Sequence, residues 1–172
     1  MKEKFEDNER WYMMTNDMVQ RQVEVVRAIT LQRLESITEE VADIMPKGFN
    51  NTIRWNVGHI LIVQDQLASN FAGLPQQLSR EFHTLFGNRS RPNEWQVEPP
   101  TLQTLSYELK KQTAYIKETL GNRLQEKATK PFVRLGFRME TIGEILTFSL
   151  HHEGMHTGVI YAIQRAIEGS NN

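Results

Sequence analysis

Apolar residues recur every three or four positions along four long stretches of the chain, which is the spacing of one face of an α-helix. Glycines and prolines, which interrupt helices, gather between these stretches. The pattern therefore predicts four long helices, at residues of about 15–34, 52–72, 101–120 and 141–168. Two short extra helices are expected at 36–44 and 79–86.

Residues that suit helix ends stand at the borders of these stretches. Asn51 or Thr52 can cap the second helix and Thr101 the third, since their side-chain oxygens accept hydrogen bonds from free backbone N–H groups. Residues 141–144, Thr-Ile-Gly-Glu, have the capping-box pattern at the start of the fourth helix. Gly73, followed by leucine and proline, ends the second helix.

Support for β-strands is poor, because no segment alternates strictly for long and no Asn-Gly or Asp-Gly turn occurs. We therefore expect a loop at about 125–140. Residues 74–100 hold four of the six prolines and form a connection long enough to cross over a bundle. The sequence predicts an all-α fold, a four-helix bundle with short extra helices, in a single domain over residues 1–172.

Composition removes several classes of function. Twenty basic and 21 acidic residues give a formal net charge of −1, which offers no basic field for nucleic acid. The chain has no cysteine, so thiol chemistry would need a thiol from the substrate. The charged N-terminal residues do not resemble a secretory signal, and no apolar run approaches the roughly 20 residues that span a bilayer. We expect a cytoplasmic protein with no membrane partner.

Two histidines interrupt the apolar stripe of the fourth helix. His152 and His156 stand four residues apart, so their rings can converge on one ion, and imidazole binds zinc, nickel, copper or iron. The alternative is a pair of hydrogen-bonded core histidines, which would require polar partners for both rings in an apolar setting.

A third ligand is expected from the second helix. His59 lies in its apolar middle, beside Gly58, which leaves space for a neighbouring helix or a ligand. Taken alone, His59 would more often be a satisfied core histidine. The other two histidines are not expected to share an ion, because His151 is rotated by about 100° from its neighbour and His83 lies in the irregular region.

Residues 152–156 also spell His-Glu-x-x-His, the zinc metalloprotease signature in which the glutamate is the general base. Such enzymes take a third protein ligand well downstream, whereas only 16 residues follow His156. We therefore disfavour a peptidase.

Segments of the second and fourth helices together resemble the DinB-like superfamily. They are Asn-Thr-Ile-Arg-Trp-Asn-Val-Gly-His-Ile at 51–60, Thr-Ile-Gly-Glu-Ile-Leu at 141–146 and His-Glu-Gly-Met-His-Thr-Gly at 152–158. The chain is also similar to the bacillithiol transferases and to the metal-binding domain of mycothiol-dependent isomerases. The resemblance covers about residues 10–168.

The resemblance implies an up-down-down-up bundle, usually a homodimer, with a three-histidine divalent-metal site. Carried over position by position, its ligands are His59, His152 and His156, and the expected metal is zinc or nickel. Many members continue the last ligand with Arg-Gly-Gln, whereas this chain has Thr-Gly-Val at 157–159, which weakens any inference about the substrate subclass.

Three functions remain open at this point. The favoured one is a transferase that uses a low-molecular-weight thiol, since three neutral imidazoles leave the ion its charge and an open position where a thiol loses its proton. The same position suits water, which makes a hydrolase the alternative. The third is a non-catalytic metal-binding bundle. The sequence assigns no catalytic residue.

Several side chains are candidates to support this site. Asn56 and Asp65 are candidates to orient an imidazole, and Glu153 is a candidate for proton transfer, although we favour a structural or surface role for it. We expect loops to shape the mouth of the pocket, and favour packing over substrate contact for their aromatic residues. These are Trp95, Phe132 and Phe137.

Overall fold

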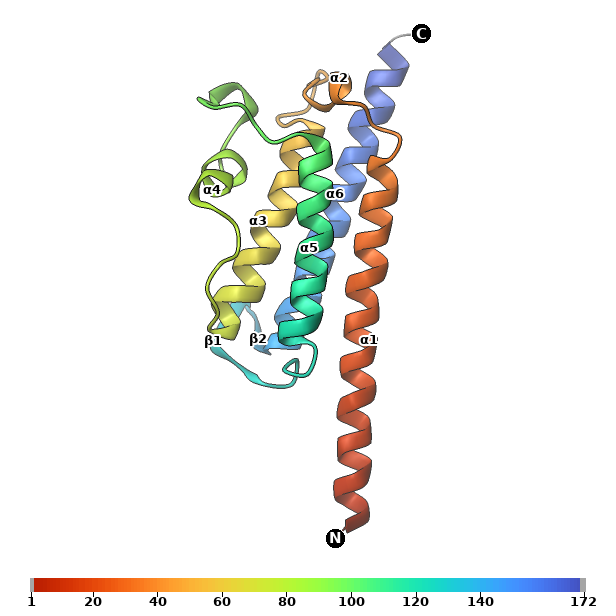
Figure 1. Ribbon diagram of the computed structural model, residues 1–172, viewed down its shortest axis with the longest axis vertical. Helices are drawn as coiled ribbons and strands as arrows, with labels where there is room; N and C mark the ends of the chain where they lie inside the picture. The colour runs from red at the N-terminus through yellow and green to blue at the C-terminus, as the bar shows by residue number, and fades with distance from the viewer. Residues whose placement is uncertain (1, 171–172) are drawn as a thin grey trace.

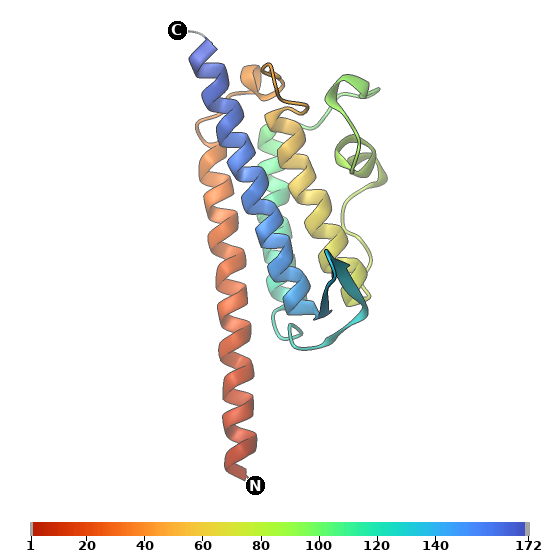
Figure 2. The same ribbon diagram turned by 180° about the vertical axis from the view of Figure 1, so that it is seen from behind.

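Four long helices build the molecule, side by side in Figure 1. The computed structural model describes residues 2–170, and within them the side chains of residues 16–169. The long helices are α1 (Lys2–Leu34), α3 (Ile53–Ala72), α5 (Leu102–Leu120) and α6 (Ile142–Ser170). Helices α1 and α6 run in one direction, and α3 and α5 run in the other (Figures 1 and 2). The predicted all-α, up-down-down-up bundle is confirmed.

Shorter elements connect the long helices. They are α2 (Glu39–Ala42), α4 (Arg80–Phe86), the 3₁₀-helix η1 (Pro92–Glu94) and the strands β1 (Lys127–Arg134) and β2 (Phe137–Thr141). Helix α2 is shorter than predicted, and α1 begins well before residue 15. Within residues 2–170, no helix is both long and apolar enough to cross a membrane.

The helix ends that the sequence predicted are present. Thr52 and Thr101 each accept a hydrogen bond from the backbone N–H three residues on, at 3.2 and 3.1 Å. At the start of α6, Glu144 N donates to Thr141 Oγ1 at 3.2 Å, while Thr141 N donates to the Glu144 carboxylate at 2.9 Å. Such bonds lower the pKa of Glu144. Gly73 ends α3 with a left-handed φ of 69°.

The interior consists of two apolar clusters at opposite ends of the bundle. Buried polar residues fall between the members of the two clusters along all four long helices, so a polar layer separates them. This layer contains Arg27, Gln64, Gln112 and Glu153. Helix α3 packs against both α5 and α6, which explains why its sequence is apolar on more than one side.

The loop predicted at 125–140 is wrong, because these residues form an antiparallel hairpin of β1 and β2. Arg134 pairs with Phe137 across a two-residue turn of Leu135 and Gly136, whose φ angles are 51° and 84°. Two positive φ angles are typical of a type I′ turn, which favours Asn-Gly. A leucine rarely adopts this conformation, so a search for the usual turn residues misses it. The hairpin lies at the end of the bundle where α6 begins (Figure 2).

Leu135→Asn should stabilise the protein. The Leu135 side chain is 88% exposed and buries little, whereas its left-handed backbone is strained and asparagine tolerates that conformation. We expect the free energy of unfolding to rise by about 0.5–1 kcal/mol in urea titrations. Phe137→Asn is the matched control, since it makes a similar change at an exposed strand position, and it should give no gain. Equal effects of the two changes would contradict the strain at Leu135.

Candidate metal centre

Three histidines from two helices meet inside the bundle. His59 comes from the middle of α3, while His152 and His156 come from adjacent turns of α6. One ring nitrogen from each lies within 4.8 Å of the others. The ring centroids are 5.2 Å apart for His59 and His152, 4.9 Å for His59 and His156, and 4.5 Å for His152 and His156. The structure therefore brings together all three histidines that the sequence singled out.

The backbone of α4 fixes the tautomer of the His59 ring. Its Nδ1 lies 2.7 Å from the carbonyl oxygen of Phe86. Because a carbonyl only accepts hydrogen bonds, Nδ1 carries the proton and Nε2 keeps a lone pair. Phe86 can approach so closely because Gly58 has no side chain: a Cβ there would lie 2.2 Å from Cγ of the phenylalanine ring. The space that we expected beside Gly58 is filled by this ring.

An asparagine fixes the second ring. Asn56 Oδ1 lies 2.7 Å from Nδ1 of His156, and Asn56 Nδ2 donates to the Thr52 carbonyl at 2.7 Å. The bond to Thr52 establishes which atom of the amide faces the histidine, so His156 also carries its proton on Nδ1. Asn56 orients an imidazole as predicted.

The same prediction for Asp65 is wrong. Its carboxylate accepts hydrogen bonds from the backbone N–H groups of Gln77 and Leu78 and from the Ser69 hydroxyl. Asp65 therefore holds the connection after α3 in place rather than a histidine ring.

The third ring has an unsatisfied nitrogen. Nδ1 of His152 is buried and has no hydrogen-bond partner among the described residues. A buried polar atom without a partner is costly, and a metal ion is one way to satisfy it. No carboxylate joins the cluster in the described part of the chain, so the donors are three imidazoles. That donor set suits a divalent transition-metal ion.

Electrostatics keep the rings neutral. Burial and the neighbouring histidines lower the pKa of His152 to about 3. Burial and the proximity of His59 lower the pKa of His156 to about 4. Burial also lowers the pKa of His59, although the bond to the Phe86 carbonyl opposes this effect. Neutral imidazole is the form that binds metals, so the site is ready to bind at neutral pH.

Trp55 forms one wall of the cluster. Its ring stacks on His59 with a centroid distance of 4.5 Å and an interplanar angle of 14°. Its Nε1 donates to Ser90 Oγ at 2.9 Å, which ties the ring to the segment that follows α4. The remaining histidines stay outside the cluster, as predicted: His151 is exposed, and His83 contacts Gln66.

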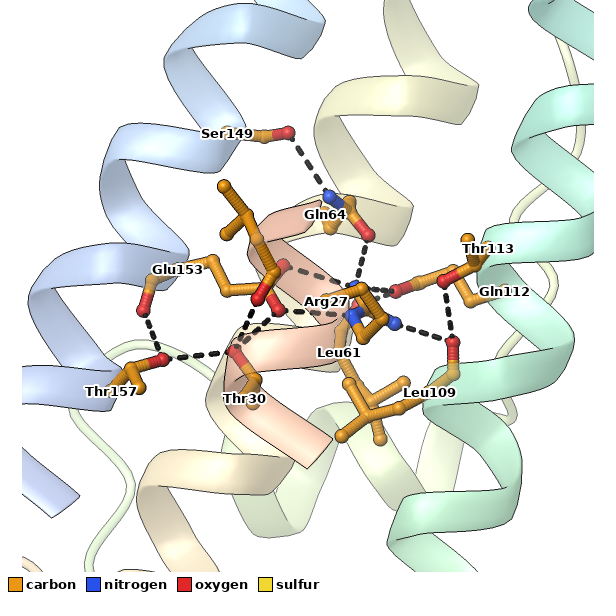
Figure 3. Close-up of polar contacts among 11 residues, drawn as sticks. Arg27, Thr30, Leu61, Gln64, Leu109, Gln112, Thr113, Ser149, Glu153 and Thr157 are labelled. Carbon is orange, nitrogen blue, oxygen red and sulfur yellow. Dashed lines mark hydrogen bonds and ion pairs between the residues drawn. The ribbon is translucent and has the colours of Figure 1, made fainter. Parts of the chain in front are cut away.

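The glutamate of the His-Glu-x-x-His pattern lies in the polar layer, where its carboxylate bonds to Arg27 and Thr30 (Figure 3). Glu153 is only 1% exposed and forms an ion pair with Arg27 at 2.9 Å. The structural role favoured from the sequence is borne out, but the surface position is not. Because both carboxylate oxygens bond to Arg27, Glu153 is not placed to act as the general base of a peptidase.

The aromatic residues of the connections mostly pack. Trp95 Nε1 donates to a carbonyl of α4, and its ring lies 5.6 Å from that of Phe86. Phe132 packs between Phe71 and Phe148, with centroid distances of 5.5 and 5.1 Å. Phe137 is exposed. The packing favoured from the sequence holds for Trp95 and Phe132.

Residues 22–160 match the family model described as the DinB superfamily. The chain belongs to the DinB superfamily. The matched span contains all three clustered histidines, and membership together with their proximity fits a divalent-metal site in this DinB chain. A comparison with curated proteins gives no match.

Gly58→Ala should destabilise the protein and loosen His59. The added methyl group would displace the Phe86 ring, whose carbonyl holds the imidazole. We expect a loss of about 1–3 kcal/mol in the free energy of unfolding, measured by urea titration. Gly154→Ala is the matched control, since nothing lies within 4 Å of its added Cβ on an exposed helix position, and it should stabilise by about 0.5–1 kcal/mol. An unchanged free energy of unfolding in Gly58→Ala would show that the close packing of Phe86 on Gly58 does not stabilise the protein.

Acid should destabilise the metal-free protein through the cluster. The pKa values of His152 and His156 lie below the ordinary 6.5, so below about pH 6.5 the unfolded chain binds protons that the folded chain does not. The contribution of these two histidines to the free energy of unfolding is therefore fully present above that pH, and it falls as the pH drops toward about 4. We expect Tm to decrease between about pH 7 and about pH 5, and to decrease less in His152→Gln. An equal decrease of Tm with pH in both proteins would contradict a lowered pKa of His152 in the folded state.

Proposed function

We propose that this chain is a metal-dependent transferase that acts with a low-molecular-weight thiol at a site formed by His59, His152 and His156. The observation that carries the proposal is the convergence of three ring nitrogens within 4.8 Å. A buried Nδ1 of His152 without a partner among the described residues adds to it. The second substrate is a small organic electrophile.

The protein's contribution is three neutral rings, two of which, His59 and His156, are oriented by hydrogen bonds before any ligand arrives. Low pKa values keep protons off His152 and His156 at neutral pH, so protons do not compete with an ion. The Phe86 carbonyl and the Asn56 amide oxygen each hold an Nδ1 proton. Those two contacts leave Nε2 of His59 and of His156 free to act as ligands.

A divalent ion held by three neutral imidazoles supplies positive charge that acidifies a thiol or a water molecule at an open position. Two features favour the thiol. A thiol is a far stronger acid than water, with a pKa of about 8.5 against about 15.7. A smaller decrease in its pKa therefore gives the anion at neutral pH. Glu153, which a hydrolase could use as a base, is bonded to Arg27. Because the chain has no cysteine, the thiol must come from the co-substrate.

A hydrolase and a non-catalytic metal-binding bundle are the outcomes that the experiments below distinguish from the transferase. The homodimer and the cytoplasmic location that we expect from the sequence stay predictions.

Metal content tests the site. The purified protein should bind about one zinc or nickel ion per chain, measured by elemental analysis and by competition with a chelating dye. His156→Ala should weaken the affinity by more than about 100-fold, because it removes a ligand. His151→Ala is the matched control, since it makes the same change at an exposed neighbour, and it should bind as the wild type does. Equal affinities in all three proteins would refute the cluster as the metal site.

The reaction class is tested on the metal-loaded protein. We expect an organic electrophile to be consumed only when a low-molecular-weight thiol is added, and the product to contain the thiol sulfur by mass spectrometry. His156→Ala should lose this activity and His151→Ala should keep it. Consumption in buffer without a thiol would identify a hydrolase, and no consumption with any of a panel of thiols would favour the non-catalytic bundle.

A further inference from the structure

A forked ion pair occupies the centre of the polar layer, next to the histidine cluster. Arg27 of α1 and Glu153 of α6 are only 2% and 1% exposed. Nε of the guanidinium donates to one carboxylate oxygen at 2.9 Å, and Nη2 donates to the other at 3.1 Å (Figure 3). Two parallel bonds of this kind restrict direction as well as distance, because both groups are planar.

The rest of the guanidinium bonds to the other two long helices. Arg27 Nη1 donates to the Leu109 carbonyl of α5 at 2.5 Å. Nη2 donates to the side-chain oxygens of Gln64 of α3 and, at 3.2 Å, of Gln112 of α5. A single side chain from α1 thereby contacts all three other long helices of the bundle (Figure 3).

The carboxylate and its neighbours tie α6 to α1 a second time. The Thr30 hydroxyl donates to Glu153 Oε1 at 2.8 Å and lies 2.9 Å from the Thr157 hydroxyl. Glu153 directly follows His152, and Thr157 directly follows His156. The polar contacts therefore hold the two residues of α6 that adjoin the histidines.

Stability alone gives a weak reason for such a pair, since replacing a buried ion pair by well-packed apolar residues is often neutral or stabilising. An apolar layer, however, tolerates small rotations and shifts of a helix. A forked ion pair keeps all of its hydrogen bonds in only one relative arrangement of the two helices. Successive residues of a helix are separated by about 100°, so the rotation that aims Glu153 at Arg27 also sets the directions of His152 and His156.

We propose that Arg27 and Glu153 are positioning residues for the histidine cluster: their pairing fixes the rotation of α6, and with it the directions in which His152 and His156 point. This inference deepens the proposed metal site and rests on it for its effect on metal binding. Its effect on the rings themselves exists without a metal.

The double variant Arg27→Met/Glu153→Leu tests the proposal, because it removes both charges and leaves neither unpaired. We expect it to remain folded by circular dichroism and to unfold cooperatively, while its affinity for zinc falls by at least about tenfold in chelator competition. The absorption spectrum of the cobalt-substituted protein should also change, since it reports ligand geometry. Lys117→Met/Glu24→Leu is the matched control: it removes an exposed ion pair between α1 and α5, and should keep the wild-type affinity and spectrum.

A measurement on the metal-free protein separates this inference from the proposed function. In wild type, the ¹⁵N shifts of the His156 ring should show a proton on Nδ1 bonded to Asn56, and the double variant should lose this signature. If the wild type binds no metal but the signature is still lost, the metal site fails and the positioning role stands. If the double variant keeps wild-type zinc affinity, cobalt spectrum and ring shifts, the positioning role is refuted.

Arg27→Lys covers the case in which the double variant does not fold. Lysine keeps the positive charge but cannot form the fork. The folded variant should bind zinc at least about threefold more weakly and show an altered cobalt spectrum, whereas wild-type values for both would refute the proposal.

Discussion

Helix α3 is buried along most of its length, so each of its buried polar side chains must find a partner inside the protein. Arg54 pairs with acidic side chains that follow α1, and Gln64 accepts a hydrogen bond from an arginine of α1. Asp65 accepts backbone N–H groups of the next connection. His59 belongs to the same series, and the Phe86 carbonyl that satisfies it also fixes its tautomer. The need of each buried polar group for a hydrogen-bond partner therefore both stabilises α3 and orients a histidine of the candidate metal site.

Local patterns in the sequence predicted the parts of the structure that depend on near neighbours in the chain. Caps such as Thr52 and Thr101 bond to a backbone N–H only three residues away. They can therefore be predicted from the sequence without knowledge of the fold. The four-residue spacing of His152 and His156 places them on one helix face for the same reason. Membership of the DinB superfamily and the predicted bundle then bring His59 to that face.

The features that the sequence did not predict depend on residues far apart in the chain. Phe86 is 27 residues from His59, and Arg27 is 126 residues from Glu153. No local spacing in the sequence indicates such pairs. Gly58 suggested space for a neighbouring helix or a ligand, but not that Phe86 would fill it. The hairpin was missed for another reason, since Leu135 occupies a turn position where asparagine or glycine is usual.

The contact between Gly58 and Phe86 makes the orientation of a core histidine depend on a connecting segment. The histidines belong to α3 and α6, whereas Phe86 belongs to the connection between α3 and α5. The acceptor that orients His59 is in place only while this connection is packed against α3. Local unfolding of this connection would therefore free the His59 ring without separating the four long helices.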